Sequence, residues 1–319
     1  MLAEALESLE RQTVAIDVVV VDNASTDGTG EMVAERFPRV KIVTTDRNLG
    51  FGKAVNRGVA AAPAETDVIV LVNNDVVCEP EFVERMLAPF DEEQVGMVAG
   101  VLLQGSAPAL VDSAGIEVDS TLRAYGALWN FPAEAVSAAP TPFGPCGGAA
   151  AYRLAAFREI GGFDPAFFAY WEDVDLALRF RLAGWECGFA PSARALHRNG
   201  QTLGAGSPAA RALDAFGRGF VLARYRVGRR SPITRASVAL VDWPALLVHL
   251  VARGELVPLR ARARGIRAGR SRGALRPPTE LATVSLHEAV ARQWRFLGLR
   301  LSGQAPRHFE KTEGTANLR

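Results

Sequence analysis

The sequence predicts an α/β protein whose core is a parallel sheet covered by helices. The chain has 319 residues, 49% of them hydrophobic, which is enough apolar material for one large domain or two modest ones. In the N-terminal third, short β-branched apolar runs alternate with helical patterns. These runs are apolar on both faces, as expected of strands that have helices on either side.

The chain opens with a helical pattern rather than with a strand. Leu2, Leu6 and Leu9 recur at helical spacing within residues 2–12, and only then does the apolar run at 16–21 predict a buried strand. A sheet of this class normally begins with a strand and continues with a helix. This chain instead begins with what looks like the helix that follows such a strand.

The elements after this strand alternate in the same way. Residues 105–145 are rich in Pro and Ala and are expected to be irregular, and the pattern turns helical after about residue 205. We expect helices at 31–36, 53–61 and 173–183, and strands at 40–45, 67–72 and 95–103.

Charge is distributed unevenly, although the formal net charge is only +1. Residues 1–204 hold 15 basic and 28 acidic side chains, whereas residues 205–276 hold 15 basic and 3 acidic ones. The acidic part suggests chemistry and the arginine-dense part an anionic surface, although a solvated helical face explains the arginines equally well. We expect a catalytic domain at 1–225, a basic helical segment at 226–276 and a C-terminal tail at 277–319.

The basic segment contains an apolar stretch, residues 237–251. At this length, and interrupted by Asp242 and Pro244, it is too short to span a bilayer. It could lie in a headgroup layer, with the arginines from Arg253 to Arg276 against an anionic leaflet, or it could pack on the catalytic domain. The two interpretations have almost equal weight.

Several classes of protein are excluded. No apolar run approaches the roughly 18 to 20 residues that span a bilayer, and the acidic N-terminal stretch is not a signal peptide. The three cysteines, Cys78, Cys146 and Cys187, are widely spaced and form no CxxC pair, so we expect no disulfide framework. A cytoplasmic protein with reduced thiols is the expectation.

Polar or glycine residues follow three successive predicted strands. Asp22 ends the first, Gly50 and Gly52 lie in the loop after the second, and the sequence NND at 73–75 ends the third. In open α/β sheets, ligands bind at the carboxyl ends of the strands. A carboxylate flanked by amides, as in NND, suits a hard cation such as Mg²⁺ or Mn²⁺ that also binds phosphates. Each motif alone is also typical of a turn or a helix N-cap.

A cluster of acids begins the helix expected at 173–183. Glu172, Asp173 and Asp175 crowd its first turn, and crowded carboxylates raise one pKa, as a general base requires. The alternative is that Asp173 is a simple N-cap. His197 follows another apolar stretch, and a lone histidine is more often structural than a ligand.

The order and spacing of six motifs resemble the inverting family-2 glycosyltransferases of the GT-A fold, especially rhamnosyltransferase-like bacterial members. The resemblance covers about residues 1–225. In this family the first metal-binding position is commonly an aspartate, where this chain has Asn73. The family's first strand also has no counterpart here, so we expect either that the start lies too far downstream or that the protein is a fragment with a weakened donor site. The motifs are VDNASTDGT, RNLGFGKAVNRG, NND, CGGAAAYR, GGFDPAFFAYWEDVDLALRFRLAGW and HRNG.

The resemblance implies a role for each matching residue. Asp173 would be the catalytic base, and Asp75 with His197 would bind the divalent metal. The nucleotide would contact Asp22, Asn23, Asn48, Gly50 and Asn74. The acceptor side and reaction centre would be lined by Trp171, Cys146, Gly147 and Gly148.

The resemblance also implies a function. It predicts transfer of a sugar such as rhamnose, with inversion, from a nucleoside-diphosphate sugar to an acceptor hydroxyl in cell-wall or surface polysaccharide assembly. The expected partners are the donor, a glycan or lipid-linked acceptor and an anionic membrane surface at the inner face of the plasma membrane, and no nucleic acid. The alternatives are a non-catalytic membrane-surface or scaffolding protein that retains the fold, and a nucleotidyltransferase.

Overall fold

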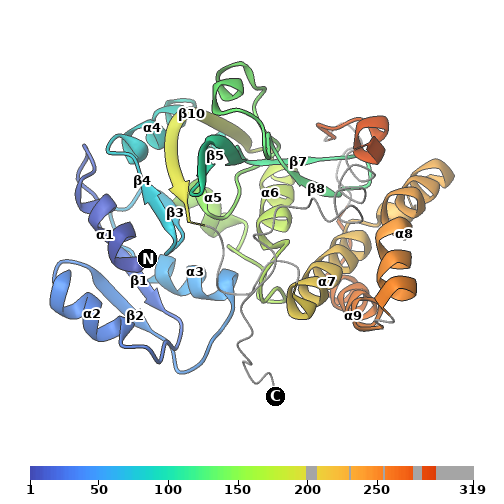
Figure 1. The fold of residues 1–319 in the computed structure, drawn as a ribbon, viewed down its shortest axis with the longest axis horizontal. Coiled ribbons are helices and arrows are strands. Elements are labelled where there is room, and N and C mark those ends of the chain that lie inside the picture. Colours follow the sequence, from blue (N-terminus) through green and yellow to red (C-terminus); the bar gives the residue numbers. More distant parts are fainter. Residues whose placement is uncertain (199–206, 230, 254–255, 276–281, 292–319) are drawn as a thin grey trace. The chain divides into compact units, whose positions relative to one another are not determined.

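The computed structural model describes residues 1–198, 207–229, 231–253, 256–275 and 282–291 (Figure 1). These residues divide into two compact units, each of which is described by itself. The first contains residues 1–118 and 123–198, and the second contains residues 119–122 and most of the helical region after 207. The catalytic-domain boundary expected at residue 225 stays a prediction.

The N-terminal part of the first unit alternates helix and strand, in blue in Figure 1. β1 and β2 pair in parallel as a separate two-stranded sheet. Leu6, Val33 and Phe37 form a buried cluster beside them, because the apolar sides of the first two helices face inward. The elements are α1 (Leu2–Glu10), β1 (Val19–Asp22), α2 (Thr29–Arg36), β2 (Lys41–Thr44) and α3 (Phe51–Ala60).

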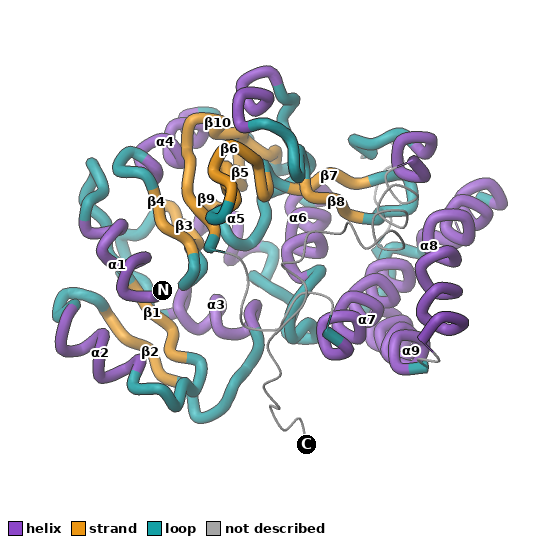
Figure 2. Tube along the Cα trace, viewed as in Figure 1, coloured by secondary structure: helices purple, strands orange, loops and turns teal. Residues whose placement is uncertain are grey.

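A six-stranded sheet forms the centre of the first unit, in orange in Figure 2. Its strand order is β3-β9-β5-β10-β4, with β6 paired to β5. Among the described strands, β1 pairs only with β2 and β3 only with β9, and the expected lack of a first strand stays a prediction. The strands are β3 (Val68–Val72), β4 (Val76–Cys78), β5 (Val95–Gln104), β6 (Ala107–Ser113), β9 (Ala149–Arg153) and β10 (Glu186–His197).

The prediction of a parallel sheet is correct for β1 with β2 and for β5 with β10, but not for the rest of the central sheet. β5 and β10 pair in parallel, but β9 runs antiparallel to both β3 and β5, and β4 runs antiparallel to β10. Two parallel strands are usually connected by a crossover α-helix. The chain between β5 and β9 contains short strands and a 3₁₀ helix but no such α-helix. Apolar runs indicate burial on two faces but carry no information about strand direction.

The prediction that residues 105–145 are irregular is also wrong. Besides β6, this stretch contains a small hairpin of β7 (Ile116–Val118) and β8 (Ala124–Gly126), and a 3₁₀ helix, η2 (Ala133–Ala138). These elements are short and rich in small residues, so they show no clear periodicity. Pairing of β6 with β5 and of β7 with β8, not the propensity of the single strands, makes them regular.

Helices cover the central sheet and complete its core. α4 packs against β10, and its Phe82 and Met86 are fully buried with Val98 of β5. α6 begins at Glu172, and Tyr152 of β9 stacks against Phe180 of this helix. The remaining helices of this unit are α4 (Phe82–Leu87), η1 (Ala88–Asp91), α5 (Leu154–Glu159) and α6 (Glu172–Leu182).

The second unit is helical, as predicted for the chain beyond residue 205. It contains α7 (Pro208–Arg224), η3 (Val227–Arg229), α8 (Pro232–Arg253) and α9 (Val257–Ser271). Within the described residues, no helix combines the length and the apolar character that a membrane span requires.

A buried ion pair joins the helices of the second unit. Nε of Arg218 in α7 lies 3.1 and 3.2 Å from the two carboxylate oxygens of Asp242 in α8. Arg262 of α9 donates to the same carboxylate. The guanidinium of Arg218 also donates two hydrogen bonds of 2.9 Å to Thr121. Asp242, which only interrupts an apolar run in the sequence, therefore neutralises two arginines in the interior of this unit.

Candidate active site

Two loops at the carboxyl ends of β1 and β2 are tied together by asparagines. Asn23 Nδ2 donates to Asn48 Oδ1 at 3.0 Å, and Asn23 Oδ1 accepts from the Leu49 backbone at 2.8 Å. Asn48 Oδ1 also accepts from the Gly50 backbone at 2.9 Å. Asp22, which is 9% exposed, accepts from the Ser25 N–H at 2.9 Å. The pair of loops therefore forms a braced platform beside the strand ends.

Gly50 has a conformational reason to be glycine. Its φ is +81°, and a Cβ there would overlap the carbonyl group of Phe168. The next residue, Phe51, donates its N–H to that carbonyl at 2.7 Å. The loop after β2 is thereby held against the segment that leads into α6.

The turn between β3 and β4 carries Asp75, and His197 at the end of β10 faces it. His197 Nε2 lies 3.3 Å from Asp75 Oδ2, and the Asp75 side chain is 8% exposed. Asn73 of the same turn lies beside Gly148, whose added Cβ would be 3.2 Å from the Asn73 amide nitrogen. Asn74 is exposed at the tip of the turn. An acid and an imidazole thus converge at one corner of the sheet.

Asp112 of β6 completes this corner, and the sequence analysis missed it. Its Oδ2 lies 2.6 Å from His197 Nδ1, on the opposite side of the ring from Asp75. Burial lowers the pKa of His197, but the hydrogen bonds to Asp112 and Asp75 outweigh it and raise the pKa to about 9. The only sequence signal was an aspartate in a stretch that we expected to be irregular.

Asp173 lies in the first turn of α6, at the loop of residues 146–148. The Gly147 N–H donates to Asp173 Oδ2 at 3.3 Å, and the Val174 N–H donates to Asp173 Oδ1 at 2.8 Å. Burial raises the pKa of Asp173, although these N–H groups act in the opposite direction. Because Gly148 adjoins Asn73, this loop connects the candidate base to the corner that holds Asp75.

The two acids near Asp173 in the same helical turn, Glu172 and Asp175, differ in their partners. Glu172 is 7% exposed, and its Oε2 has no hydrogen-bond partner among the residues that the structure describes. Burial and the charge of Asp173 raise the pKa of Glu172 to about 8. Asp175 is buried but lies 2.8 Å from Arg179 Nε, one helical turn later. Asp175 is therefore a structural partner of Arg179.

The residues expected on the acceptor side lie around Asp173 but differ in exposure. Trp171 is 7% exposed, whereas its neighbour Tyr170 is 40% exposed. Trp171 and Tyr170 both have left-handed backbone conformations, with φ of 74° and 66°, which residues other than glycine rarely adopt. Burial and the charge of Asp173 raise the pKa of Cys146 to about 12, so its thiol stays protonated. All three cysteines are free, as predicted.

The described side chains offer few ligands for a metal ion. Among the described residues, no group of three or more His, Cys, Asp or Glu side chains could hold a metal ion. Asp75 and His197 still present one carboxylate and one imidazole at hydrogen-bonding distance. Such a pair fits a cation that takes its other ligands from substrate phosphates and water.

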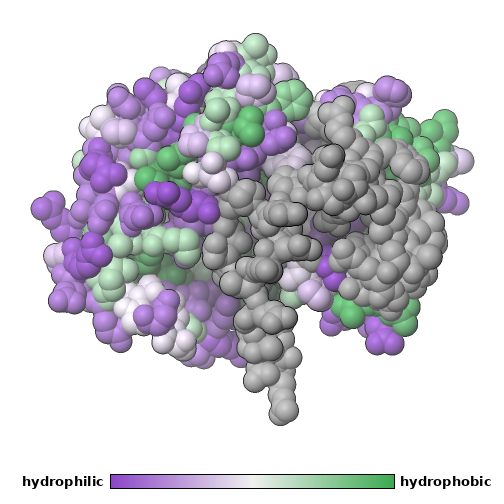
Figure 3. Space-filling view, in the orientation of Figure 1, coloured by the Kyte–Doolittle hydropathy of each residue, from purple (hydrophilic) through white to green (hydrophobic). Residues whose placement is uncertain are grey.

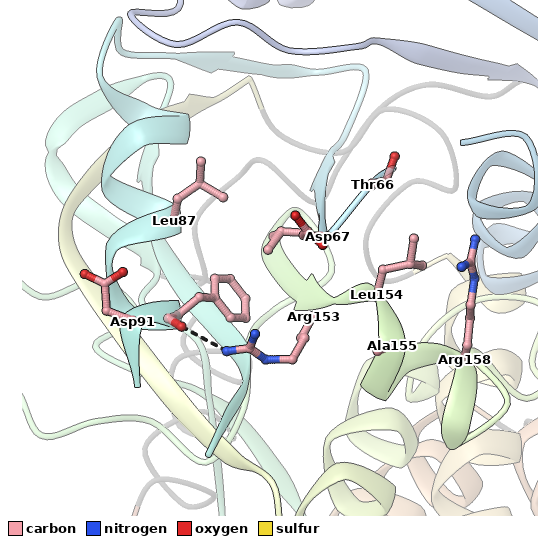
Figure 4. A pocket seen from close by; sticks show the side chains of 10 residues that line it. Thr66, Asp67, Leu87, Asp91, Arg153, Leu154, Ala155 and Arg158 are labelled. Carbon is pink, nitrogen blue, oxygen red and sulfur yellow. Dashed lines mark hydrogen bonds between the residues drawn. The ribbon is translucent and has the colours of Figure 1, made fainter. Parts of the chain in front are cut away.

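A surface pocket lies elsewhere on the sheet and takes no part in this site. It has a volume of about 420 Å³, and Figure 4 shows Asp67, Arg153 and Arg158 among its lining side chains. Arg153 donates to the Phe90 carbonyl at 2.9 Å. Val68, which also lines the pocket, begins β3, whereas Asp75 follows the other end of that strand.

Comparison with known proteins identifies relatives of this chain. The model of the family described as glycosyl transferase family 2 matches residues 1–161. The chain is 31% identical over 211 residues to the N-acetylglucosaminyl-diphospho-decaprenol L-rhamnosyltransferase of Mycobacterium tuberculosis, which covers 59% of this chain and 68% of the relative. It is 24% identical over 190 residues to the O-antigen chain rhamnosyltransferase WbaN of Salmonella anatum, covering 58% and 57%.

Solved structures share the fold. A mannosyltransferase of Pyrobaculum calidifontis, in complex with GDP-Man and Mn²⁺, aligns with a TM-score of 0.52 at 19% identity, covering 94% of this chain and 76% of that one. GalNAc-T7 with UDP, GalNAc and Mn²⁺ aligns with a TM-score of 0.56 at 14% identity, covering 86% and 53%. At these identities the likeness concerns the fold.

Proposed function

The chain belongs to glycosyltransferase family 2, and we propose that it transfers a rhamnosyl group from a nucleoside diphosphate to an acceptor hydroxyl with inversion. One observation carries this proposal. The loop of residues 146–148 contacts Asp173 on one side and adjoins Asn73, of the turn that holds Asp75, on the other. A candidate base and a candidate diphosphate site therefore lie on either side of the same short loop.

Asp173 is the proposed general base. Its carboxylate takes the proton of the acceptor hydroxyl as that oxygen bonds to the anomeric carbon of the sugar, and the diphosphate leaves with the electrons of its bond to that carbon. A raised pKa makes the carboxylate a better proton acceptor once it is ionised. The Gly147 N–H holds the carboxylate in place.

Asp75 and His197 are the proposed ligands of a divalent cation. Mn²⁺ accompanies the nucleotide in the two solved structures above, which supports the same assignment here. Such a cation, when bound, would offset the charge that develops on the leaving diphosphate. Asp112 would accept the Nδ1–H of His197 and orient the ring, so that a bound cation would take the place of the Nε2 proton that faces Asp75.

The donor would bind on the platform formed by the loops after β1 and β2. Asp22 stands at the end of β1, where a carboxylate can accept hydrogen bonds from a base or ribose. The hydrogen bonds between Asn23, Asn48 and the Gly50 backbone supply the rigidity. Asn74, which is exposed beside Asp75, can reach the same ligand.

The acceptor is proposed to be a lipid-linked glycan used in cell-wall or surface polysaccharide assembly. Two relatives support this assignment, one named for a decaprenol-linked N-acetylglucosaminyl acceptor and one for O-antigen chains. An acceptor in a membrane would require the enzyme to work at its cytoplasmic face, as a peripheral protein. Tyr170, exposed next to Trp171, is the candidate contact for the acceptor sugar.

A donor panel tests the proposal. The full chain is incubated with dTDP-rhamnose, UDP-N-acetylglucosamine or GDP-mannose, polyprenyl-diphospho-N-acetylglucosamine, and either Mn²⁺ or EDTA. We expect rhamnose transfer that needs the cation and yields the opposite anomer. Transfer of another sugar would overturn the donor assignment, and full activity in EDTA would overturn the metal assignment. Nucleotide binding without any transfer would indicate a non-catalytic protein.

A further inference from the structure

Helix α9 has two faces of different character. Its buried positions are Pro258, Ala261, Gly265 and Gly269, which recur every three or four residues. Four arginines recur at the same spacing on the opposite side and are exposed: Arg260, Arg264, Arg267 and Arg270. We call these four residues the arginine face.

Glycines fix which face of α9 turns outward. A Cβ added to Gly265 would overlap the Phe216 carbonyl of α7, and one added to Gly269 would overlap the Phe220 carbonyl. Gly219 of α7 approaches the backbone of α9 in the same way. The two helix backbones are therefore in direct contact, which rules out rotation of α9 on α7 without steric overlap. The arginine face must point away from α7.

The arginine face is not neutralised within the described residues. Of the five arginines in α9, only Arg262 binds inward, to Asp242. The first turn of α9 contains no acid. Of the described acids of this unit, Asp119 and Asp242 are buried, and Asp214 and Glu288 are exposed but form no ion pair with these four arginines. Four like charges on one rigid face thus lack partners in the described chain.

Apolar side chains adjoin the arginine face along the helix. Leu256 and Val257, at the start of α9, are each 49% exposed, and Leu256 lies one helical turn before Arg260. In the same unit, Ile233 and Leu240 of α8 are 77% and 51% exposed, and Figure 3 shows apolar side chains over α8. A basic face with an apolar end matches the boundary between anionic headgroups and acyl chains.

We propose that the arginine face of α9 docks the protein on an anionic lipid bilayer. Because the apolar side of α9 is already packed on α7, attraction between arginines and headgroup phosphates must supply most of the binding. Binding should therefore need anionic lipid and fall as salt is added. The inference deepens the proposed function, since it assigns the surface that would bring the enzyme to a lipid-linked acceptor.

Vesicle co-sedimentation of the full chain tests the inference. We compare vesicles of phosphatidylcholine alone with vesicles that contain phosphatidylglycerol, at low and high salt. Each basic residue near an anionic leaflet strengthens binding about fivefold. The variant Arg264→Gln/Arg267→Gln should therefore weaken binding to anionic vesicles roughly 25-fold, while glutamine preserves the helix.

A matched control separates this face from net charge. Arg11 and Arg39 are exposed in the first unit, so Arg11→Gln/Arg39→Gln removes the same charge from another surface. The control should bind vesicles like the wild type, and both variants should melt like it. Equal loss of binding in the two variants, or no binding of the wild type to anionic vesicles, would overturn the inference. Binding of RNA through the arginine face, together with no binding to anionic vesicles, would overturn the inference as well.

Activity measurements keep the inference distinct from the proposed function. With a water-soluble, short-chain acceptor analogue, Arg264→Gln/Arg267→Gln should keep wild-type turnover. Failure of every transfer assay, with vesicle binding intact, would count against the proposed function only. Loss of turnover on the soluble analogue would mean that these arginines serve the reaction itself, which contradicts a docking role.

Discussion

The carboxylate of Asp242 in the second unit has different neighbours from those of Glu172 and Asp173 in the first unit. In the second unit, Asp242 is 2% exposed and is neutralised by Arg218 and Arg262. In the first unit, Glu172 is 7% exposed and Asp173 is partly buried, and no ion pair to a basic side chain is found for either among the described residues. Backbone N–H groups are the partners of Asp173 instead.

The difference distinguishes a structural acid from a chemical one. A buried carboxylate with two guanidinium partners is stably ionised, and its role is to hold helices together. A buried carboxylate without a cation has a raised pKa and gains a favourable partner when a proton or a substrate arrives. Burial alone would not separate Asp242 from Glu172, which is 7% exposed, whereas the identity of the neighbours does.

The largest expected effect is that of Asp173→Asn on turnover. The change removes a proton acceptor at almost constant volume, so we expect a rate loss on the order of 10² to 10⁴ with little change in melting temperature or nucleotide affinity. Single-turnover transfer assays and calorimetry measure the three quantities. Near-normal turnover with a much lower melting temperature would mean that Asp173 is a helix cap.

Asp242→Asn should act on stability and leave the chemistry unchanged. It leaves the buried Arg218 and the partly buried Arg262 without their counter-charge, which is expected to cost about 3 to 5 kcal/mol in the free energy of unfolding. Urea denaturation measures this, with the exposed Asp17→Asn as the control. A variant as stable as the wild type would remove the contrast between the two kinds of buried acid.

Asp112→Asn should weaken divalent-cation binding in the presence of nucleoside diphosphate. Asp112→Asn removes the carboxylate that holds Nδ1 of His197, which is expected to reduce metal affinity about 10- to 100-fold. Asp75→Ala removes a proposed ligand itself and should abolish the metal dependence of nucleotide binding. Titration of Mn²⁺ in the presence of nucleoside diphosphate, monitored by electron paramagnetic resonance, measures the Mn²⁺ affinity of each variant. Asp91→Asn, at the pocket on the other end of the sheet, should bind Mn²⁺ like the wild type. If Asp112→Asn and Asp91→Asn bind Mn²⁺ equally well, Asp112 has no positioning role.

Glu172→Gln should have the smallest effect on the reaction and a pH-dependent effect on stability. The pKa of Glu172 is raised from 4.5 to about 8, so the folded state keeps a proton that the unfolded chain loses. This carboxyl therefore costs increasing stability as the pH rises from 4.5 to 8, and costs none below that window. The variant should melt like the wild type near pH 4.5 and above it at pH 8. A melting difference that is the same at both pH values would contradict the raised pKa.

Local patterns in the sequence were sufficient for the elements that carry most of the site. The helices at α1, α3 and α6, the strands β3 and β5, and the order of the motifs could be predicted, because each depends on the spacing of apolar and turn-forming residues over a short stretch. The acids at the start of α6 could be recognised for the same reason. The family followed from that order, and the match to residues 1–161 confirms it.

Only the tertiary structure decided strand direction and the partners of the buried charges. The antiparallel pairing of β9 and the contact of Asp112 with His197, 85 residues apart, depend on distant segments. The strands within 105–145 depend on pairing with a neighbouring strand. Asp242 likewise meets Arg218 and Arg262 only when three helices pack. The sequence determined which residues carry charge and which runs are apolar. The fold determined which charges meet, because the energy of a buried charge depends on neighbours that local patterns do not specify.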